Sequence, residues 1–259
     1  MLLGMLHRRA SALAACNINP TACMSPWFAL AAPCHTAQTY STSSSHTSQY
    51  EDESAWEDKL QRARIRPLEF YESHAAEREY FYYVSSRGGL YLEDTVPKNI
   101  ATSLKSPKFL SFFTQQLRKN EGKHADAYPW ISPCGKEMNY VSAALTPVVF
   151  TALEGTADAA ACTLSVNNAF DVEFQPDQLA MDESGRLYHS TAGRQARTGK
   201  YGLVASAVAV QLAPHIELVD DDVGSWAEAA ERGTPVAQLS WNGHEHDICA
   251  CTAGMGVLS

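Results

Sequence analysis

The stretch that decides the fold runs from Glu79 to Val84 and reads Glu-Tyr-Phe-Tyr-Tyr-Val. Aromatic and β-branched side chains favour strands, and this run places aromatic rings on both faces of an extended chain. Turn-forming residues follow at 85–89, and Leu90-Tyr91-Leu92 then restores an apolar pattern. We therefore expect a β-hairpin at the start of the globular part, with its rings packed in the core.

A helix is expected next, beginning at Ser106-Pro107, because Ser is a good N-cap and Pro is tolerated in the first turn. An apolar stripe at helical spacing supports this helix and consists of Phe109, Leu110, Phe113 and Leu117. Arg118 and Lys119 suit the negative end of a helix dipole, so we expect the helix to include them and to stop at Gly122.

Short strands account for much of the remaining chain. They are expected at 128–131, 137–141, 148–153, 162–166, 170–174, 186–189, 236–241 and 244–250. Tight turns are expected at Asn167-Asn168 and Asn242-Gly243. The segment 202–213 fits a strand or a helix, and its Ala content favours the helix. The predicted fold class is α+β: short antiparallel strands forming two related curved-sheet units with one or two packed helices.

The first 50 residues differ in charge from the rest of the chain. They contain no acidic residue, and their only Lys or Arg residues are Arg8 and Arg9. Residues 36–48 are rich in Ser and Thr. This composition is typical of a mitochondrial transit peptide, whereas a secretory signal would need a continuous apolar core. We expect a transit peptide and disordered leader at 1–48, followed by a charged linker or surface helix at 49–78. A globular domain is expected at 79–252, with possible sub-units 79–153 and 154–252, and a flexible tail at 253–259.

The charge of the chain disfavours one class of partner. With 20 basic and 29 acidic residues the net charge is −9, and it becomes −11 without the two leader arginines. A surface this acidic repels phosphate backbones, so direct nucleic-acid binding is not expected. No apolar run is long enough for a transmembrane helix. A reducing matrix would keep Cys134, Cys162, Cys249 and Cys251 as thiols.

Several motifs resemble a small eukaryotic family known as uncharacterised protein family 0598. They are Arg78–Val84, Leu90–Asp94, Lys98-Asn99, Pro107–Phe113, Ser132–Gly135, Pro147–Thr151, Gly185–His189, Gly202–Val204, Trp241 and Gly243. The resemblance covers most of residues 78–245 and implies a mitochondrial protein of no established activity, with no catalytic residues to carry over. Met138 and Ser142 depart from it, since basic residues are expected there. A weaker likeness to bacterial proteins with another domain of unknown function implies two related α+β units and ligand binding or signalling.

The segment from Ser132 to Asn139 is the first candidate site. Its candidate residues are Ser132, Cys134, Lys136, Glu137 and Asn139. Pro133 and Gly135 flank the thiol, so a sharp turn should present it, and the neighbouring lysine can lower its pKa. A nucleophile also needs a base, and no histidine lies nearby in the sequence. The alternative is a structural turn between two strands.

Two further segments carry candidate chemistry. Arg186, Tyr188 and His189 can face an anionic ligand, although an ordinary half-buried strand has the same pattern. His244, His246, Cys249 and Cys251 are zinc-type ligands, but the two-residue period of a strand separates the histidines from the cysteines. We expect surface histidines there, and no metal or cofactor.

The sequence lacks the nucleotide-binding, nucleophile-elbow and metalloprotease motifs that identify common enzymes. The leading expectation is a non-catalytic mitochondrial matrix protein that binds a protein partner or a small ligand, as an accessory to a large mitochondrial assembly. The alternative is an enzyme that uses Cys134 as nucleophile or redox thiol.

Overall fold

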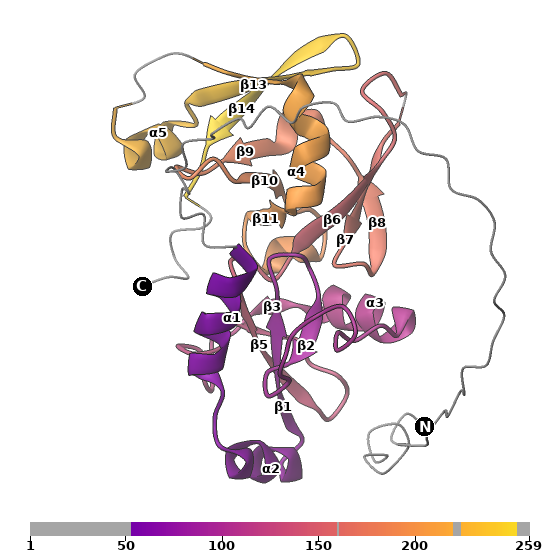
Figure 1. The fold of residues 1–259 in the computed structure, drawn as a ribbon, viewed down its shortest axis with the longest axis vertical. Coiled ribbons are helices and arrows are strands. Elements are labelled where there is room, and N and C mark those ends of the chain that lie inside the picture. The colour runs from indigo at the N-terminus through magenta and orange to yellow at the C-terminus, as the bar shows by residue number, and fades with distance from the viewer. Residues whose placement is uncertain (1–52, 160, 220–223, 253–259) are drawn as a thin grey trace, which may run out of the picture. The chain divides into compact units, whose positions relative to one another are not determined.

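The computed structural model describes residues 53–159, 161–219 and 224–252 (Figure 1). The chain divides into Met1–Ser48 and Gln49–Ser259, and every described residue belongs to the second unit. The expected transit peptide at 1–48 and the expected tail at 253–259 lie outside the described residues. None of the described helices is both long enough and apolar enough to cross a membrane.

The smaller sheet has five strands in the order β2-β1-β5-β4-β3. They are β1 (Glu79–Val84), β2 (Leu90–Leu92), β3 (Arg118–Lys119), β4 (Trp130–Ile131) and β5 (Met138–Ala143). Strand β1 pairs with β2 along one edge and with β5 along the other, and its two faces pack in different hydrophobic clusters. Tyr82 packs in one hydrophobic cluster and Phe81 in another. The predicted hairpin is confirmed, and so is the burial of its aromatic rings.

The larger sheet has nine strands in the order β12-β13-β14-β9-β10-β11-β6-β7-β8. They are β6 (Val149–Glu154), β7 (Thr163–Val166), β8 (Phe170–Glu173), β9 (Leu179–Met181), β10 (Leu187–Ser190), β11 (Tyr201–Val204), β12 (Ile216–Leu218), β13 (Pro235–Trp241) and β14 (His244–Ala250). The chain passes from one sheet to the other between β5 and β6. Asn167, Asn168, Asn242 and Gly243 all have positive φ, which confirms the two predicted hairpin turns.

The described residues contain five α-helices, more than the one or two expected. They are α1 (Glu53–Arg64), α2 (Leu68–Ala76), α3 (Pro107–Gln116), α4 (Ser206–Leu212) and α5 (Trp226–Arg232), with short 3-10 turns η1 (Pro176–Gln178), η2 (Gln195–Arg197) and η3 (Ala213–His215). The expected end of α3 was wrong. Leu117 is fully buried and leaves the helix in an extended conformation, and the next two residues pair with β4 instead. The ambiguous segment 202–213 is a strand followed by a helix.

The α+β fold class is confirmed, with two mixed and mostly antiparallel sheets. The expectation of antiparallel strands alone was incomplete, because β1–β5, β6–β11 and β9–β14 are parallel pairs. Parallel neighbours need long connections, and each of these pairs is separated by other strands or helices. Such pairings depend on distant parts of the chain, so local sequence patterns do not reveal them.

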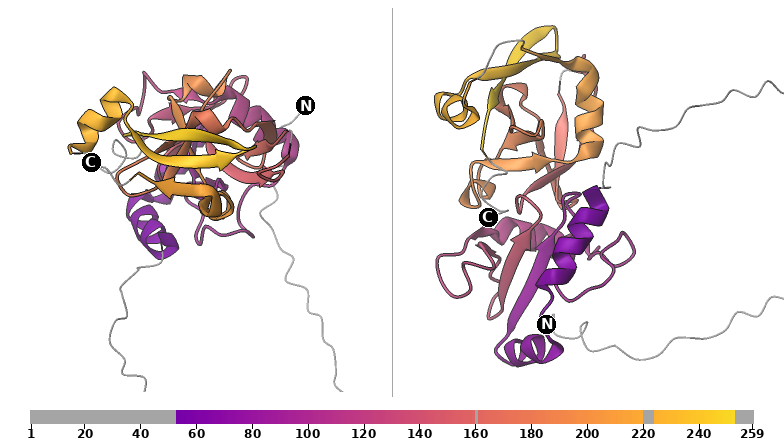
Figure 2. Two further views of the ribbon diagram at one scale, coloured as in Figure 1. Left: turned by 90° about the horizontal axis from the view of Figure 1, so that it is seen from above. Right: turned by 60° about the vertical axis from the view of Figure 1, so that its left-hand side comes forward.

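The hydrophobic core extends through both sheets. Helix α4 lies along the larger sheet beside β6 (Figure 2). Its buried side chains are Val208 and Leu212. A second cluster joins Phe113 of α3 to Leu203 of β11. Trp130 belongs to the smaller sheet, and Thr198 lies just before β11 of the larger sheet. The indole N–H of Trp130 donates to the carbonyl of Thr198 at 3.0 Å. Residues of both sheets therefore share one packed interior.

Candidate functional site

The predicted turn at 132–139 is a tight hairpin between β4 and β5. Cys134 and Glu137 exchange two backbone hydrogen bonds of 2.9 and 3.0 Å, and Gly135 between them has φ +64°. The fully buried Ser132 hydroxyl donates to a carbonyl at 2.8 Å in α3. The Asn139 side-chain amide donates to the Ser132 carbonyl at 2.7 Å. These polar groups hold the hairpin against the rest of the fold.

The surroundings of the thiol in this hairpin disfavour its thiolate form. Burial, and then the negative charge of Glu137, raise the pKa of Cys134. A higher pKa leaves less thiolate at neutral pH, and thiolate is the nucleophilic form. Lys136 therefore does not produce the lowered pKa that its place in the sequence suggested.

The second predicted group is organised around Asp182, a buried residue that the sequence did not single out. The Tyr188 hydroxyl donates to Asp182 Oδ2 at 2.9 Å, while Oδ1 accepts the backbone N–H groups of Ser184 and Arg186 at 2.9 and 3.0 Å. Burial and the Asp182 carboxylate raise the pKa of Tyr188. Tyr188 is therefore part of the interior, whereas the half-buried Arg186 lines a cavity of about 640 Å³.

His189 lies on the other face of β10 and is also buried. Its Nδ1 lies 2.8 Å from the Ser190 carbonyl oxygen, and its Nε2 lies 3.1 Å from that of Gln175. Burial lowers the pKa of His189, although both carbonyls act in the opposite direction. His189 lines a separate cavity of about 180 Å³, so the residues predicted from 186–189 do not face one shared site.

The candidate ligands at 244–251 are divided as strand alternation requires. The irregularity in the pairing lies at Pro235/Ala237 in β13, so β14 keeps its two-residue period. His244 and His246 share a face, with ring centroids 6.5 Å apart, and His246 Nδ1 bonds to Asp177. Cys249 lies on the opposite face.

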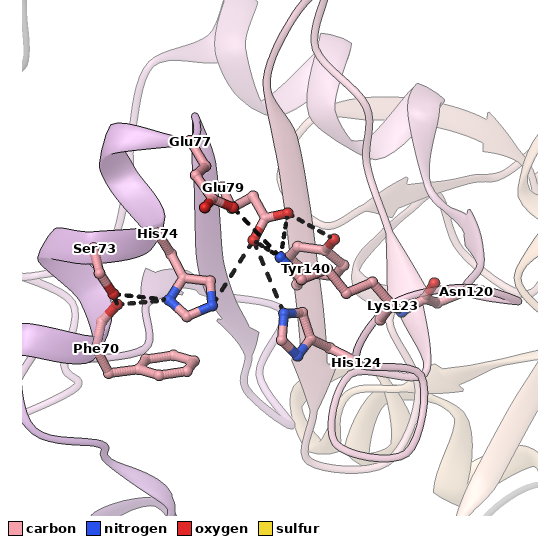
Figure 3. A network of polar contacts seen from close by, with 9 residues as sticks. All are labelled: Phe70, Ser73, His74, Glu77, Glu79, Asn120, Lys123, His124 and Tyr140. Carbon is pink, nitrogen blue, oxygen red and sulfur yellow. Dashed lines mark hydrogen bonds and ion pairs between the residues drawn. The ribbon is translucent and has the colours of Figure 1, made fainter.

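The structure assembles a polar cluster that the sequence did not predict (Figure 3). We call it the His74–Glu79–His124 cluster. His74 comes from α2, Glu79 from the start of β1, and Lys123 and His124 from the loop between β3 and β4. Glu79 Oε2 lies 3.9 Å from Nε2 of each histidine and 2.8 Å from Lys123 Nζ. Its other oxygen accepts from the Tyr140 hydroxyl at 3.3 Å.

Aromatic rings and backbone groups hold this cluster in place. The Phe81 ring packs against both imidazoles, with centroids 5.2 Å from His74 and 5.8 Å from His124. The Asn120 side chain donates to the carbonyls of Lys123 and Tyr128 at 2.8 and 2.9 Å, which closes the loop. His124 itself has φ +62°, a conformation uncommon outside glycine.

The electrostatics of the cluster are dominated by Glu79. Burial acts to raise the pKa of Glu79, but hydrogen bonds from Lys123 and Tyr140 and the lysine charge outweigh it, so this pKa is lowered. Burial, and then the charge of Lys123, lower the pKa of His124. The ionised carboxylate of Glu79 thus lies between Lys123 and two imidazole rings. No short motif signals this arrangement, because the histidines lie on separate elements.

A buried carboxylate lies in the turn that follows β2. Glu93 is almost completely buried and accepts hydrogen bonds from the hydroxyls of Tyr71 and Tyr128 at 3.0 and 2.6 Å. Burial raises the pKa of Glu93. The two tyrosines satisfy this carboxylate, so it anchors α2 and the β3–β4 loop to the sheet.

Residues 71–250, which include most of the described elements, match the model of the family described as Domain of unknown function (DUF4505). The chain belongs to the DUF4505 family. Among solved structures, this DUF4505 protein is similar to a DUF1285 family protein from Silicibacter pomeroyi DSS-3, with a TM-score of 0.38 and 12% identity over 74% of this chain and 93% of that one. A DUF1285 family protein from Shewanella baltica OS155 gives a TM-score of 0.35 and 13% identity, over 52% of this chain and 91% of the other.

Proposed function

We propose that this protein is a non-catalytic binding module of the mitochondrial matrix that takes a small amphipathic carboxylate. The observation that carries the proposal is the cavity of about 640 Å³ between α4 and strands β10 and β11. Its volume is within the usual range for small-ligand sites, which combine apolar walls with a few polar groups.

The cavity walls define the chemistry of the ligand. Leu203 and Val204 of β11 and Ala209 and Val210 of α4 form apolar walls. Arg186 lines the same cavity, and its Nη1 donates to the Ser184 hydroxyl at 2.6 Å. A guanidinium beside an apolar wall suits a molecule with an aliphatic body and one carboxylate, because Arg binds carboxylates through paired hydrogen bonds.

Calorimetric titration with dodecanoate tests this assignment. We expect saturable binding, with dodecanol binding at least ten-fold more weakly because it lacks the charge. Arg186→Gln should weaken dodecanoate binding roughly ten-fold, the usual worth of a charge-assisted hydrogen bond. Arg194→Gln is the matched control, since Arg194 is exposed and is not among the residues lining the cavity. Equal affinity of the two variants would exclude Arg186 as the carboxylate-binding residue.

The proposed matrix location is supported by the composition of the leader. Residues 1–50 carry arginine but no acidic residue, which suits mitochondrial import. Import of the full chain into isolated mitochondria, and its loss on deletion of 1–48, tests the location.

The resemblance also supports membership of uncharacterised protein family 0598 within the DUF4505 family. Co-purification from mitochondria with a reproducible large assembly would support the accessory role.

The alternative function is an enzyme that uses Cys134. Its sharp hairpin presents the thiol only partly buried, which is the observation that favours it. The raised pKa of Cys134 counts against it. Alkylation of Cys134 faster than free cysteine at neutral pH would favour the enzyme, whereas slower alkylation would remove its nucleophile.

A further inference from the structure

The His74–Glu79–His124 cluster contains the donor atoms of a metal site. One ligand atom from each side chain lies within 4.8 Å of the other two, and no other group of three His, Cys, Asp or Glu side chains in the described ranges meets this criterion. Two imidazole nitrogens and one carboxylate oxygen form a ligand set that proteins use for zinc.

The His74 ring is oriented for this role. Its Nδ1 lies 2.7 Å from the carbonyl oxygen of Phe70, one helical turn earlier in α2. A carbonyl oxygen only accepts, so Nδ1 carries a proton, and Nε2 is the ring nitrogen that faces Glu79. Zinc-binding histidines are held in this way by a hydrogen bond from the other ring nitrogen.

His124 supplies an independent observation. Its Nε2 is buried and has no hydrogen-bond partner among the described residues. A buried polar atom without a partner is costly, so it is rarely left in a native fold unless another group binds it. This atom lies 3.9 Å from Glu79 Oε2, on the side of the carboxylate that also faces His74.

We propose that His74, Glu79 and His124 bind a zinc ion through the two Nε2 atoms and Oε2. Ligand atoms in a tetrahedral zinc site lie roughly 3.3 Å apart. The two distances from Glu79 Oε2 are 3.9 Å and all three ligand atoms lie within 4.8 Å of one another, so side-chain adjustments can close the site. Three protein ligands leave the fourth coordination position for water. The site is independent of the carboxylate cavity proposed above.

Lys123 controls access to this site. Its ammonium donates to both Glu79 oxygens, at 2.9 and 2.8 Å, and therefore occupies the carboxylate that the metal needs. Zinc binding releases Oε2 from the lysine, whose Nζ already lies 3.6 Å from Glu77 Oε2. Lys123 is half exposed, so this movement needs no rearrangement of the core. Removing the lysine charge should consequently strengthen zinc binding.

The test is a zinc titration of the untagged full chain against a competing chelator dye, after metal removal. The wild type should bind one zinc ion that His74→Gln and His124→Gln each weaken at least ten-fold. Lys123→Gln should tighten binding roughly ten-fold, because a cation next to the metal is removed. Substitution of cobalt for zinc should give the visible absorption of a tetrahedral ion in the wild type and in Lys123→Gln.

Matched controls make each outcome decisive. His244→Gln removes an exposed imidazole outside the cluster and should leave the affinity unchanged. Lys123→Gln alters an exposed surface group, so it remains informative even where a histidine variant unfolds. Unchanged or weaker binding in Lys123→Gln would overturn the proposal. Wild-type affinity in folded His74→Gln or His124→Gln would do the same.

Discussion

At the scale of single residues, His189 contributes to the way the free energy of unfolding depends on pH. Its ring is buried and its pKa is lowered, chiefly by burial. Between this lowered value and the unfolded value of about 6.5, the unfolded chain binds more protons than the folded one. The contribution of His189 to stability is therefore complete above pH 6.5 and is lost as the pH falls through that window.

Replacement of this imidazole should flatten the pH profile. We expect the free energy of unfolding of His189→Gln to fall less than that of the wild type between about pH 7.5 and pH 5.5, measured by urea denaturation. The variant is expected to be less stable overall, because the ring packs against Phe150 and Phe174. His244→Gln, on an exposed position, serves as the comparison. Identical pH slopes for His189→Gln and the wild type would contradict this account.

At the scale of elements, Asn167 connects the β7–β8 hairpin to the start of β6. Its side-chain oxygen accepts from the Val149 N–H at 2.6 Å, and its amide donates to the Pro147 carbonyl at 2.8 Å. Both bonds are buried. Asn167→Ala should lower the free energy of unfolding by about 2–4 kcal/mol. The variant loses two buried hydrogen bonds, and alanine is also strained in the left-handed backbone conformation of this position.

The neighbouring Asn168 is a matched control for that prediction. It has nearly the same positive φ, 53° against 50° for Asn167, but its side chain is exposed. Asn168→Ala should therefore lose only about 1 kcal/mol, the backbone part of the effect. Urea denaturation of both variants checks the difference. Equal losses would show that the side-chain bonds of Asn167 contribute nothing.

The same turns show what the sequence can predict. Asn167-Asn168 and Asn242-Gly243 were predicted because the preference of Asn and Gly for positive φ is a local property. The end of α3 was missed because it depends on the burial of Leu117 and on pairing with β4, both set by distant residues. The range 49–78, expected as a charged linker or surface helix, contains two helices, α1 and α2, on either side of Pro67.

The candidate site was harder to predict for the same reason. His74 and His124 lie on separate elements and meet only because α2 and the β3–β4 loop both pack against β1. The turn expected at 132–139 and the strand expected at 186–189 are both present. However, Asp182, which accepts a hydrogen bond from the Tyr188 hydroxyl, belongs to no motif that would single it out in the sequence.

At the scale of the whole molecule, the shared core predicts cooperative unfolding. One buried cluster includes Phe113 of α3 and Leu203 of the larger sheet, and Trp130 is hydrogen-bonded to Thr198. Neither sheet can therefore lose its packing without exposing apolar surface of the other. In urea, the loss of circular dichroism and the change in tryptophan fluorescence should have one midpoint.

Trp130 and Trp241 can report on the two sheets separately once the other four of the five tryptophans are replaced by Phe. A variant that keeps only Trp130 has a buried reporter in the smaller sheet, and a variant that keeps only Trp241 has one in the larger sheet. Each variant should show fluorescence and circular dichroism transitions that coincide, at a midpoint shifted by its own destabilisation. Two resolved transitions in either variant would show that the sheets unfold independently.

The position of β14 has a consequence for biosynthesis. This strand lies between β13 and β9 and pairs with both, so it joins one side of the larger sheet to the other. A ribosome delivers β9 well before residues 244–250, and during that interval β9 has an edge with unpaired N–H and C=O groups. The nascent chain is then prone to aggregation, and we expect it to depend on a holding chaperone until its late strand arrives.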